Sequence, residues 1–417
     1  MAKKLKFLIW DTGLSLVHSL RLAKDGHQVF YYTPWQTAFP RFQDYAIGLG
    51  FENEGLYKIK HFWDYIDKVD YIVFFDIGAG DMANFLRSKG YKVYGASKGE
   101  RLEEERFNSR KIQKTIGLPV QQTVKVQGIN NLRKYLKSNP NKYVKLDLFR
   151  GDVDSFYAKN YESVIMLLDE IETAFGPFKE KKAFICEDYI KAITEFGNDA
   201  FFNSRKFLTP HLFGREMSKA SYVGKWTNNL PSVLQNTLDK LTPVFQKLDY
   251  RGAFSSEERV VSKDKSYLID MCCRLPFPLS AGYTEAITNF TEIIVAIAEG
   301  KDIEIKPKNK YLITLPLETQ HAQNNWVKLD FNPKLLTEGK IKIRCATKID
   351  NKYYMVKGLS TAYILISCCD TIKQGIKEIE EVSKEVDCVG LDKDGIGGLY
   401  KIQEEIEEIN NKLKWNF

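Results

Sequence analysis

Apolar runs alternate with amphipathic segments along the first hundred residues of the chain. The apolar runs predict β-strands at 6–10, within 24–32, at 71–75 and at 91–94, and helical periodicity predicts helices at 14–23 and 82–89. Strands that alternate with helices in this way form an open parallel sheet. We therefore expect a Rossmann-like domain over residues 1–100.

Two loops of this region carry candidate binding residues. Asp11 and Gly13 follow the first strand, and Asp76 and Gly78 follow the strand at 71–75. Ligands of open parallel sheets bind beyond the carboxyl ends of the strands, so these four residues are candidates for substrate binding. The glycines are equally compatible with tight turns alone. The dinucleotide pattern GxGxxG is absent after the first strand, so the sequence does not predict a nicotinamide site.

The pattern changes near residue 95, where short strands and longer helices replace the regular alternation. A charged helix is predicted at 99–117, strands at 143–149, 183–190, 199–208, 252–261 and 266–272, and further helices at 161–175, 230–248 and 289–300. Such a mixture is typical of an α+β arrangement. We expect two lobes over 101–190 and 191–305, followed by a small C-terminal α+β domain over 306–417.

The strands at 252–261 and 266–272 form a predicted β-hairpin with an acidic face. A two-residue turn at Lys263–Asp264 places Glu257 opposite Asp270, and a four-residue turn places Glu257 opposite Cys272. Both registers leave the two acids on one face, because a shift of two residues preserves the side. Two carboxylates on one face repel each other. A divalent cation such as Mg²⁺, held together with substrate phosphates, would remove that repulsion.

Taken alone, the hairpin favours a solvated acidic surface in which Asp270 pairs with Arg259 or Arg274. A three-residue turn would also separate the two acids. Arg274 has a second possible use, because an arginine next to an acidic pair can bond a transferred phosphoryl group or a substrate carboxylate.

Composition and charge place the chain among ordinary globular proteins. Its 417 residues are 44% hydrophobic and 28% charged. Lys and Arg number 61 against 54 Asp and Glu, and this mild excess is spread along the chain, which favours a solvated surface over a nucleic-acid groove. No segment approaches the ~20 apolar residues of a membrane span. Seven cysteines without framework spacing indicate reduced thiols and a cytoplasmic protein, and the histidines do not cluster with them as in zinc sites.

The order of these features resembles the ATP-grasp superfamily, and within it the phosphoribosylamine–glycine ligases. The resemblance extends loosely through nearly the whole chain and is strongest at 70–119, 143–149, 183–208 and 250–300. It implies the ATP-grasp fold, an α/β plus α+β architecture in which a Rossmann-like domain precedes the ATP-grasp lobes and a small C-terminal domain follows them. It also implies ATP and Mg²⁺ as cofactors.

The resemblance assigns two basic residues to the nucleotide phosphates. Arg106, in the segment GERLEEERFNSRKIQKTIGLPV, matches a position at which the family usually has lysine, and Lys145, in YVKLD, matches the second basic residue. The glycine-rich loop that follows in the family is replaced here by LFRGDVDSF. Within that loop, Arg150 could donate to a phosphate.

The hinge between the two lobes is implied by the segment FICEDYI. Glu187 matches the first acid of the paired-acid hinge, and adenine would bond to the backbone between Asp188 and Ile190. Glu195, in the next strand pair, would lie near the ribose.

The acidic hairpin matches the family's metal-binding hairpin. Glu257 and Asp270 would hold magnesium, and Arg274 matches the catalytic arginine that ends the pattern Glu-x-Asn-x-Arg. Cys272 stands where that pattern has asparagine, and a thiol is a poor ligand for magnesium. The family's acceptor loop is replaced by SYVGKWTNNLP, so the identity of the acceptor does not follow from the resemblance.

The activity implied is that of an ATP-dependent carboxylate–amine ligase in purine biosynthesis. It would activate the carboxylate of an amino acid, glycine first, as an acylphosphate, which a phosphorylated amine such as phosphoribosylamine would attack. The expected partners are these small molecules, without membrane or nucleic acid, for a monomer or homodimer. Two alternatives stay open. The replaced acceptor loop favours another amine, such as a modified nucleotide, and Cys272 with the lost glycines favours a non-catalytic nucleotide-binding relative.

Overall fold

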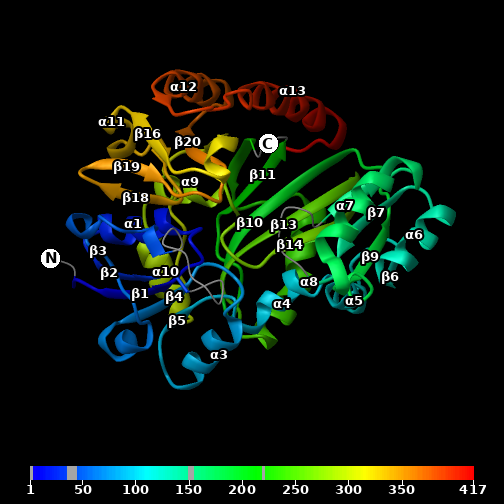
Figure 1. Cartoon of the computed structure of the whole chain (residues 1–417), viewed down its shortest axis with the longest axis horizontal. Helices are drawn as coiled ribbons and strands as arrows, with labels where there is room; N and C mark the ends of the chain where they lie inside the picture. Colours follow the sequence, from blue (N-terminus) through cyan, green and yellow to red (C-terminus); the bar gives the residue numbers. More distant parts are fainter. Residues whose placement is uncertain (1–2, 35–44, 149–154, 218–220) are drawn as a thin grey trace.

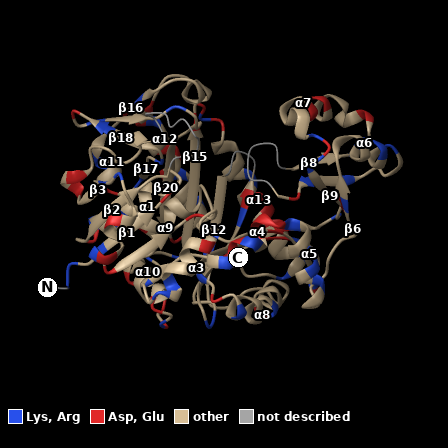
Figure 2. Cartoon of the chain, turned by 60° about the horizontal axis from the view of Figure 1, so that its bottom comes forward, with Lys and Arg blue, Asp and Glu red and all other residues tan. Residues whose placement is uncertain are grey.

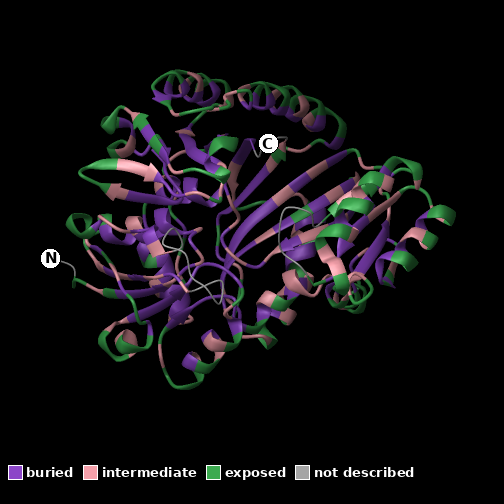
Figure 3. Cartoon of the chain, viewed as in Figure 1, coloured by how far each residue is buried: buried purple, intermediate pink, exposed green. Residues whose placement is uncertain are grey.

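The computed structural model describes residues 3–34, 45–148, 155–217 and 221–417. The described strands form four β-sheets, with helices around them (Figure 1). The strands are mostly buried, and most of the exposed residues lie on the surrounding helices and loops (Figure 3). In the part of the chain that is described, no helix combines the length and apolar character needed to cross a lipid bilayer.

The N-terminal sheet is the open parallel sheet that the sequence predicts. Its order is β3-β2-β1-β4-β5, and all neighbours run parallel. Because β1 lies between β2 and β4, the loops after β1 and β4 meet at the point where the order reverses, which is where such sheets bind ligands. The bounds are β1 Lys6–Trp10, β2 Gln28–Tyr32, β3 Leu56–Lys58, β4 Tyr71–Phe74, β5 Val93–Tyr94, α1 Leu16–Lys24 and α3 Gly80–Ser88.

A second, antiparallel sheet has the order β6-β9-β7-β8 and lies at the right of Figure 1. Helices α6 and α7 contribute Leu132 and Leu168 to a buried cluster that this sheet shares with them. The bounds are β6 Thr123–Gln127, β7 Lys142–Leu146, β8 Ser155–Ala158, β9 Ala183–Asp188, α6 Ile129–Ser138 and α7 Ile165–Phe175. This lobe therefore has a hydrophobic core of its own.

The largest sheet has eight antiparallel strands in the order β14-β13-β10-β11-β12-β15-β20-β17. It runs across the predicted boundary at 305/306, because β15, β17 and β20 belong to the expected C-terminal domain. The strand bounds are β10 Thr194–Asn203, β11 His211–Met217, β12 Ser221–Thr227, β13 Arg251–Ser262, β14 Lys265–Cys272, β15 Tyr311–Glu318, β17 Ile341–Lys342 and β20 Thr361–Cys369. The helices between them are α8 Ser232–Lys247, α9 Ser280–Ala286 and α10 Phe290–Ala298.

A small fourth sheet and two long helices complete the C-terminal region. The sheet has the order β18-β19-β16-β21. The bounds are β16 Val327–Phe331, α11 Pro333–Thr337, β18 Ala346–Ile349, β19 Lys352–Met355, α12 Ile372–Lys384, β21 Val386–Asp387 and α13 Ile396–Leu413. Helix α13 packs across β11 and β12 of the large sheet (Figure 1). The C-terminal region is thus attached to the large sheet both by strands and by this helix.

Two predicted elements differ from the structure for identifiable reasons. The single charged helix expected at 99–117 breaks at Glu105 into α4 Arg101–Glu104 and α5 Arg106–Thr115. Asp147 binds the start of α5, because its backbone oxygen and Oδ1 accept from the N–H groups of Arg106 and Phe107. The strand expected at 199–208 is β10, which spans Thr194–Asn203. It ends at Asn203 because the side chain of Asn203 accepts from two backbone N–H groups and turns the chain.

Charged residues of both signs are distributed over the elements of the molecule (Figure 2). Their distribution agrees with the solvated surface that the sequence predicts. Glu258 of β13 is among the acids that are instead buried, and it lies beneath α8, where Ser266 Oγ and Thr237 Oγ1 donate to it at 2.6 and 3.0 Å. Burial raises the pKa of Glu258 to about 7.

The buried Glu258 predicts a pH-dependent stability. A carboxyl whose folded pKa is raised contributes stability below its ordinary pKa of 4.5 and loses that contribution as the pH rises through about 7. We expect Glu258→Gln, which stays neutral, to unfold like the wild type near pH 5. At pH 8 it should be more stable by about 1–3 kcal/mol.

Denaturant unfolding of both proteins between pH 5 and pH 8 measures this difference. The exposed Glu170 of α7 provides the control, and Glu170→Gln should follow the wild type at every pH. A difference between Glu258→Gln and the wild type that does not change with pH would contradict the assignment.

Candidate active site

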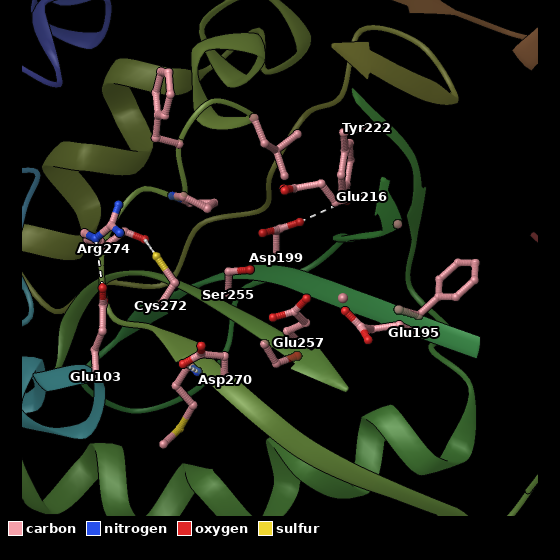
Figure 4. A pocket seen from close by; sticks show the side chains of 18 of the residues that line it. Glu103, Glu195, Asp199, Glu216, Tyr222, Ser255, Glu257, Asp270, Cys272 and Arg274 are labelled. Atoms are coloured by element: carbon pink, nitrogen blue, oxygen red, sulfur yellow. Dashed lines mark hydrogen bonds and ion pairs between the residues drawn. The ribbon is translucent and has the colours of Figure 1, made fainter. Parts of the chain in front are cut away.

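Glu257 and Asp270 face each other across the hairpin of β13 and β14 (Figure 4). The tip pairs Ser262 with Lys265, as the predicted two-residue turn requires. Two irregularities interrupt the ladder between the tip and the acids, one at each strand, and their register shifts cancel. The predicted opposition of the two acids is therefore confirmed, although a regular ladder is not what produces it.

The irregularity beside Asp270 turns backbone carbonyls toward cationic side chains of the second sheet and α5. Lys145 Nζ donates to the backbone oxygen of Ile269 at 3.0 Å and lies 3.3 Å from Asp270 Oδ2. Arg110 donates to the same carbonyl and to that of Leu268. Burial raises the pKa of Asp270, but the charges of Lys145, Arg106 and Arg110 more than offset this, so that the pKa lies below its ordinary value.

A buried ion pair holds the hinge strand against α5. The Nε of Arg110 lies 2.5 Å from Glu187 Oε1, and both side chains are nearly inaccessible to solvent, at 6% and 2% exposure. Burial raises the pKa of Glu187, but Arg110 reverses the shift and holds that pKa below its usual value. Glu187 is therefore a charged, fully engaged side chain at the hinge.

Arg259 of β13 and Glu195 of β10 form an ion pair near the hinge strand. Arg259 Nε bonds to Glu195 Oε2 at 2.9 Å, and its guanidinium lies over the rings of Tyr143 and Tyr189. Desolvation in the cleft, followed by the hydrogen bond that protonated Glu257 donates to Glu195, raises the pKa of Glu257 well above its usual range. Burial also acts to raise the pKa of Glu195, but its hydrogen bond with Glu257 and the charge of Arg259 outweigh burial and lower that pKa, so that Glu257 is the more readily protonated of the two acids.

Two adjoining cavities share the acidic hairpin as a common wall. The smaller, of about 260 Å³, is lined by Lys145, Glu187, Asp188, Ile190, Glu195, Glu257 and Asp270 among others. The larger, of about 300 Å³, is also lined by Glu195, Glu257 and Asp270, and extends to Arg106 and Arg274. The structure thus brings together every predicted phosphate, hinge, ribose and metal residue except Arg150, which lies outside the described residues.

Arg274 occupies one end of the larger cavity (Figure 4). Its Nε lies 3.0 Å from Glu103 Oε1 on α4 and 3.5 Å from Asp76 Oδ1. The second oxygen of Glu103 accepts from the backbone N–H of Cys273 at 2.6 Å. Glu103 therefore fixes both the guanidinium and the backbone of the strand end. Cys272, at the expected asparagine position, lines the cavity with its sulfur 3.7 Å from the backbone oxygen of Arg274.

The four loop residues predicted from the N-terminal sheet lie in different surroundings. Asp11 is fully buried and accepts from the backbone N–H groups at the start of α1 and from the Tyr31 hydroxyl. Asp76 accepts from Thr12 Oγ1 at 2.6 Å beside Arg274. Gly13 and Gly78 have positive φ angles of 96° and 95°. These φ angles favour glycine in a turn, which accounts for both glycines. Of the four residues, only Asp76 contacts a residue that lines a cavity, namely Arg274.

Comparison with known proteins bears on the fold. No protein-family model and no curated protein sequence matches the chain. The solved phosphoribosylamine–glycine ligase of Thermotoga maritima is similar with a TM-score of 0.71, over 93% of this chain and 98% of that chain, at 16% identity. The biotin carboxylase of Campylobacter jejuni reaches a TM-score of 0.67 over 99% of both chains, at 13% identity. The chain has the ATP-grasp fold.

The N5-carboxyaminoimidazole ribonucleotide synthetase of Thermotoga maritima is also similar, with a TM-score of 0.60 over 93% of this chain and 99% of that chain, at 13% identity. Similarity therefore extends over nearly the full length of each of these chains. The ATP-grasp fold expected from the sequence is confirmed.

The sequence reading missed two residues that contact predicted site residues, namely Glu103, which lines the larger cavity, and Arg110. Both lay in the charged helix predicted at 99–117, with Glu103 about two turns before Arg110. Arg110 contacts Glu187 and Glu103 contacts Arg274, and the resemblance marks both of these partners. The sequence marks these two residues only by their positions along α4 and α5. Each side chain reaches a site residue because the helix breaks at Glu105.

The Arg110–Glu187 pair predicts a large loss of stability when one partner is removed. Arg110→Leu leaves a buried carboxylate without its cation, and we expect a loss of about 3–5 kcal/mol in the free energy of unfolding. Arg133→Leu is the control, because Arg133 pairs with the more exposed Asp169 and Glu172 and should cost about 1 kcal/mol or less.

Denaturant unfolding measures both changes. The double variant Arg110→Leu/Glu187→Leu should recover part of the loss, since it leaves no unpaired buried charge. Equal losses for the single and double variants would show that the packing of Arg110, not its charge, is what matters.

Proposed function

We propose that the protein is an ATP-dependent carboxylate–amine ligase that forms an amide through an acylphosphate. One observation carries this proposal: Glu257 and Asp270 oppose each other in the wall between two cavities, one lined by Lys145 and the hinge and the other by Arg274. A phosphoryl group held at such a wall can pass from a nucleotide in one cavity to a carboxylate in the other.

The residues present fit a magnesium ion that is held jointly with a substrate. No set of three or more His, Cys, Asp or Glu side chains within the described ranges is arranged to hold a metal alone. Mg²⁺ usually takes one or two carboxylates and completes its shell with phosphate oxygens and water. Glu257 and Asp270 would supply the two carboxylates, and the bound ion would neutralise charge on the transferred phosphoryl group.

The chain's own residues would act by position and charge. Lys145, held by the Ile269 carbonyl beside Asp270, would contact the nucleotide phosphates, and the strand end at Asp188–Ile190 would present backbone groups to adenine. Arg106 and Arg274 would hold the acylphosphate oxygens in the larger cavity. Phosphoryl transfer of this kind needs positioning and charge neutralisation and no nucleophilic side chain.

The similarity to the phosphoribosylamine–glycine ligase of Thermotoga maritima supports a finer proposal. The carboxylate would belong to an amino acid, glycine first, and the amine would be phosphoribosylamine or a similar phosphorylated amine. Incubation of the purified protein with ATP, Mg²⁺, glycine and phosphoribosylamine should release phosphate. Release with other amines only would favour a ligase for a different acceptor, such as a modified nucleotide.

The metal assignment predicts the loss of ATP turnover in two variants. Glu257→Gln and Asp270→Asn should each lower Mg²⁺-dependent ADP formation by about a hundredfold or more, because each removes one carboxylate of the pair that holds the ion. A coupled ADP assay measures the rate, and thermal unfolding checks that both variants fold.

Asp264→Asn, at the exposed tip of the same hairpin, is the matched control and should turn over ATP like the wild type. Full activity in both site variants would refute the metal assignment. Nucleotide binding without ADP formation in the wild type, for every acid and amine tried, would favour a non-catalytic relative.

A further inference from the structure

Gln121 lines the smaller cavity and has no role in the proposed mechanism. It comes shortly before β6, which pairs with the hinge strand β9 at one edge of the second sheet (Figure 1). Thr123 pairs with Glu187 in that ladder, and the backbone oxygen of Gln122 accepts from the N–H of Asp188 at 3.0 Å. Gln121 is therefore held beside the strand end to which the proposed function assigns adenine.

The backbone of Gln121 is fixed, whereas its side-chain amide is unused. The Thr123 hydroxyl donates to the backbone oxygen of Gln121 at 3.0 Å. Gln121 is only 8% exposed, and its amide oxygen Oε1 makes no hydrogen bond with any residue of the described ranges. A buried amide oxygen without a donor is costly in a folded protein. A ligand that brings an N–H group to this part of the cavity would remove that cost.

The two acids beside Gln121 are already engaged by cations of the protein. Arg110 donates to both carboxylate oxygens of Glu187, at 2.5 and 3.2 Å. Lys142 donates to Asp188 Oδ1. The amide of Gln121 is therefore the better placed of these groups to accept from a ligand, because a ligand need not displace a protein cation to reach it.

The chemistry of a carboxamide matches one edge of adenine. A glutamine side chain carries a carbonyl acceptor and an NH₂ donor side by side. Adenine carries a 6-amino donor beside the N7 acceptor, and glutamine is one of the side chains that bond both of these atoms together in DNA recognition. Tyr143 and Ile190 line the same cavity and offer apolar surface to the ring.

We propose that Gln121 recognises the 6-amino group of adenine and thereby selects ATP as the nucleotide. Its Oε1 would accept from the 6-amino group, and its Nε2 would donate to N7. The 6-amino group has two N–H donors, so this contact is compatible with backbone contacts at Asp188–Ile190. The inference rests on the proposed ligase function and adds to it a specificity-determining side chain outside the hinge segment FICEDYI.

A purely structural amide is the competing explanation, and it predicts the opposite change in stability. An amide that serves the packing of the lobe would destabilise the protein when replaced, without changing which nucleotide binds. Gln121→Leu instead removes an unpaired buried polar group at nearly constant volume. The nucleotide-free variant should therefore be at least as stable as the wild type.

Calorimetric titration of the full-length protein with two nucleotides tests the proposal. The nucleotides are ATP and purine riboside 5′-triphosphate, which lacks only the 6-amino group, each with Mg²⁺ and without acid or amine substrate. The readout is thus binding and not turnover. We expect the wild type to bind ATP about tenfold or more tightly, because an amide that contacts adenine at two atoms discriminates by about that factor.

Two variants assign that preference to the side chain. Gln121→Leu and Gln121→Ala should lower the ratio of the two dissociation constants by about fivefold or more, through weaker binding of ATP alone. The neighbouring Gln122 is exposed and provides the matched control, so Gln122→Leu should keep the wild-type ratio. Thermal unfolding without nucleotide should place the midpoint of Gln121→Leu at or above that of the wild type.

Three results would overturn the proposal. The first is equal binding of the two nucleotides by the wild type. The second is a preference that survives both substitutions of Gln121, and the third is an equal loss of preference in Gln122→Leu. A lowered unfolding midpoint with an unchanged ratio would show a structural amide. A failure of every nucleotide to bind would instead contradict the proposed ligase function on which the inference rests.

Discussion

The opposition of Glu257 and Asp270 is the constraint on which the rest of the site depends. Two like charges held face to face are unfavourable unless a proton or a cation lies between them, and burial, then Glu195 and then Asp270 raise the pKa of Glu257 well above its usual range. The hairpin holds them there through two register shifts that cancel. The shift beside Ile269 turns a carbonyl toward Lys145 and Arg110, so one backbone irregularity joins the acids to the cations of the facing lobe.

The same contacts join two lobes that have separate hydrophobic cores. The smaller sheet packs with α6 and α7, and its buried residues form a cluster apart from the main core. Lys145 and Arg110 reach from β7 and α5 to the edge strand β14, where the cavities meet. In the proposed function, a nucleotide bound between the lobes would change their spacing by breaking and reforming these polar contacts, without opening a hydrophobic core.

The fold was largely predictable, because its strands and helices keep clear periodicities. Apolar runs located β1, β4, β13 and β14, and the resemblance supplied their arrangement. Local patterns could not show that β15 and β20 extend the large sheet, since pairing between strands far apart in sequence leaves no periodic signal. The break at Glu105 was missed for a similar reason, because the residue that causes it, Asp147, lies on another element.

The site residues also fall into a group that the sequence predicts and a group that it does not. Lys145, Glu187, Glu257 and Asp270 were predictable because they stand in a recognisable order, and their shared cavities agree with it, although their roles stay predictions. Asp199 and Glu216 match no such pattern. Their strands lie together only in the folded sheet, and a single sequence gives no reason to pair an acid of β10 with one of β11.

The distribution of charge between the cavities sets the orientation of any substrate. The larger cavity is lined by two arginines and seven acids, and Figure 4 shows Arg274 on the other side of the cavity from Glu216 and Tyr222. A phosphate or carboxylate beside Asp199 and Glu216 would meet negative charge, and an ammonium beside Arg274 would meet positive charge. In the proposed function, the chain therefore selects a substrate with opposite charges at its two ends and fixes which end meets the phosphoryl group.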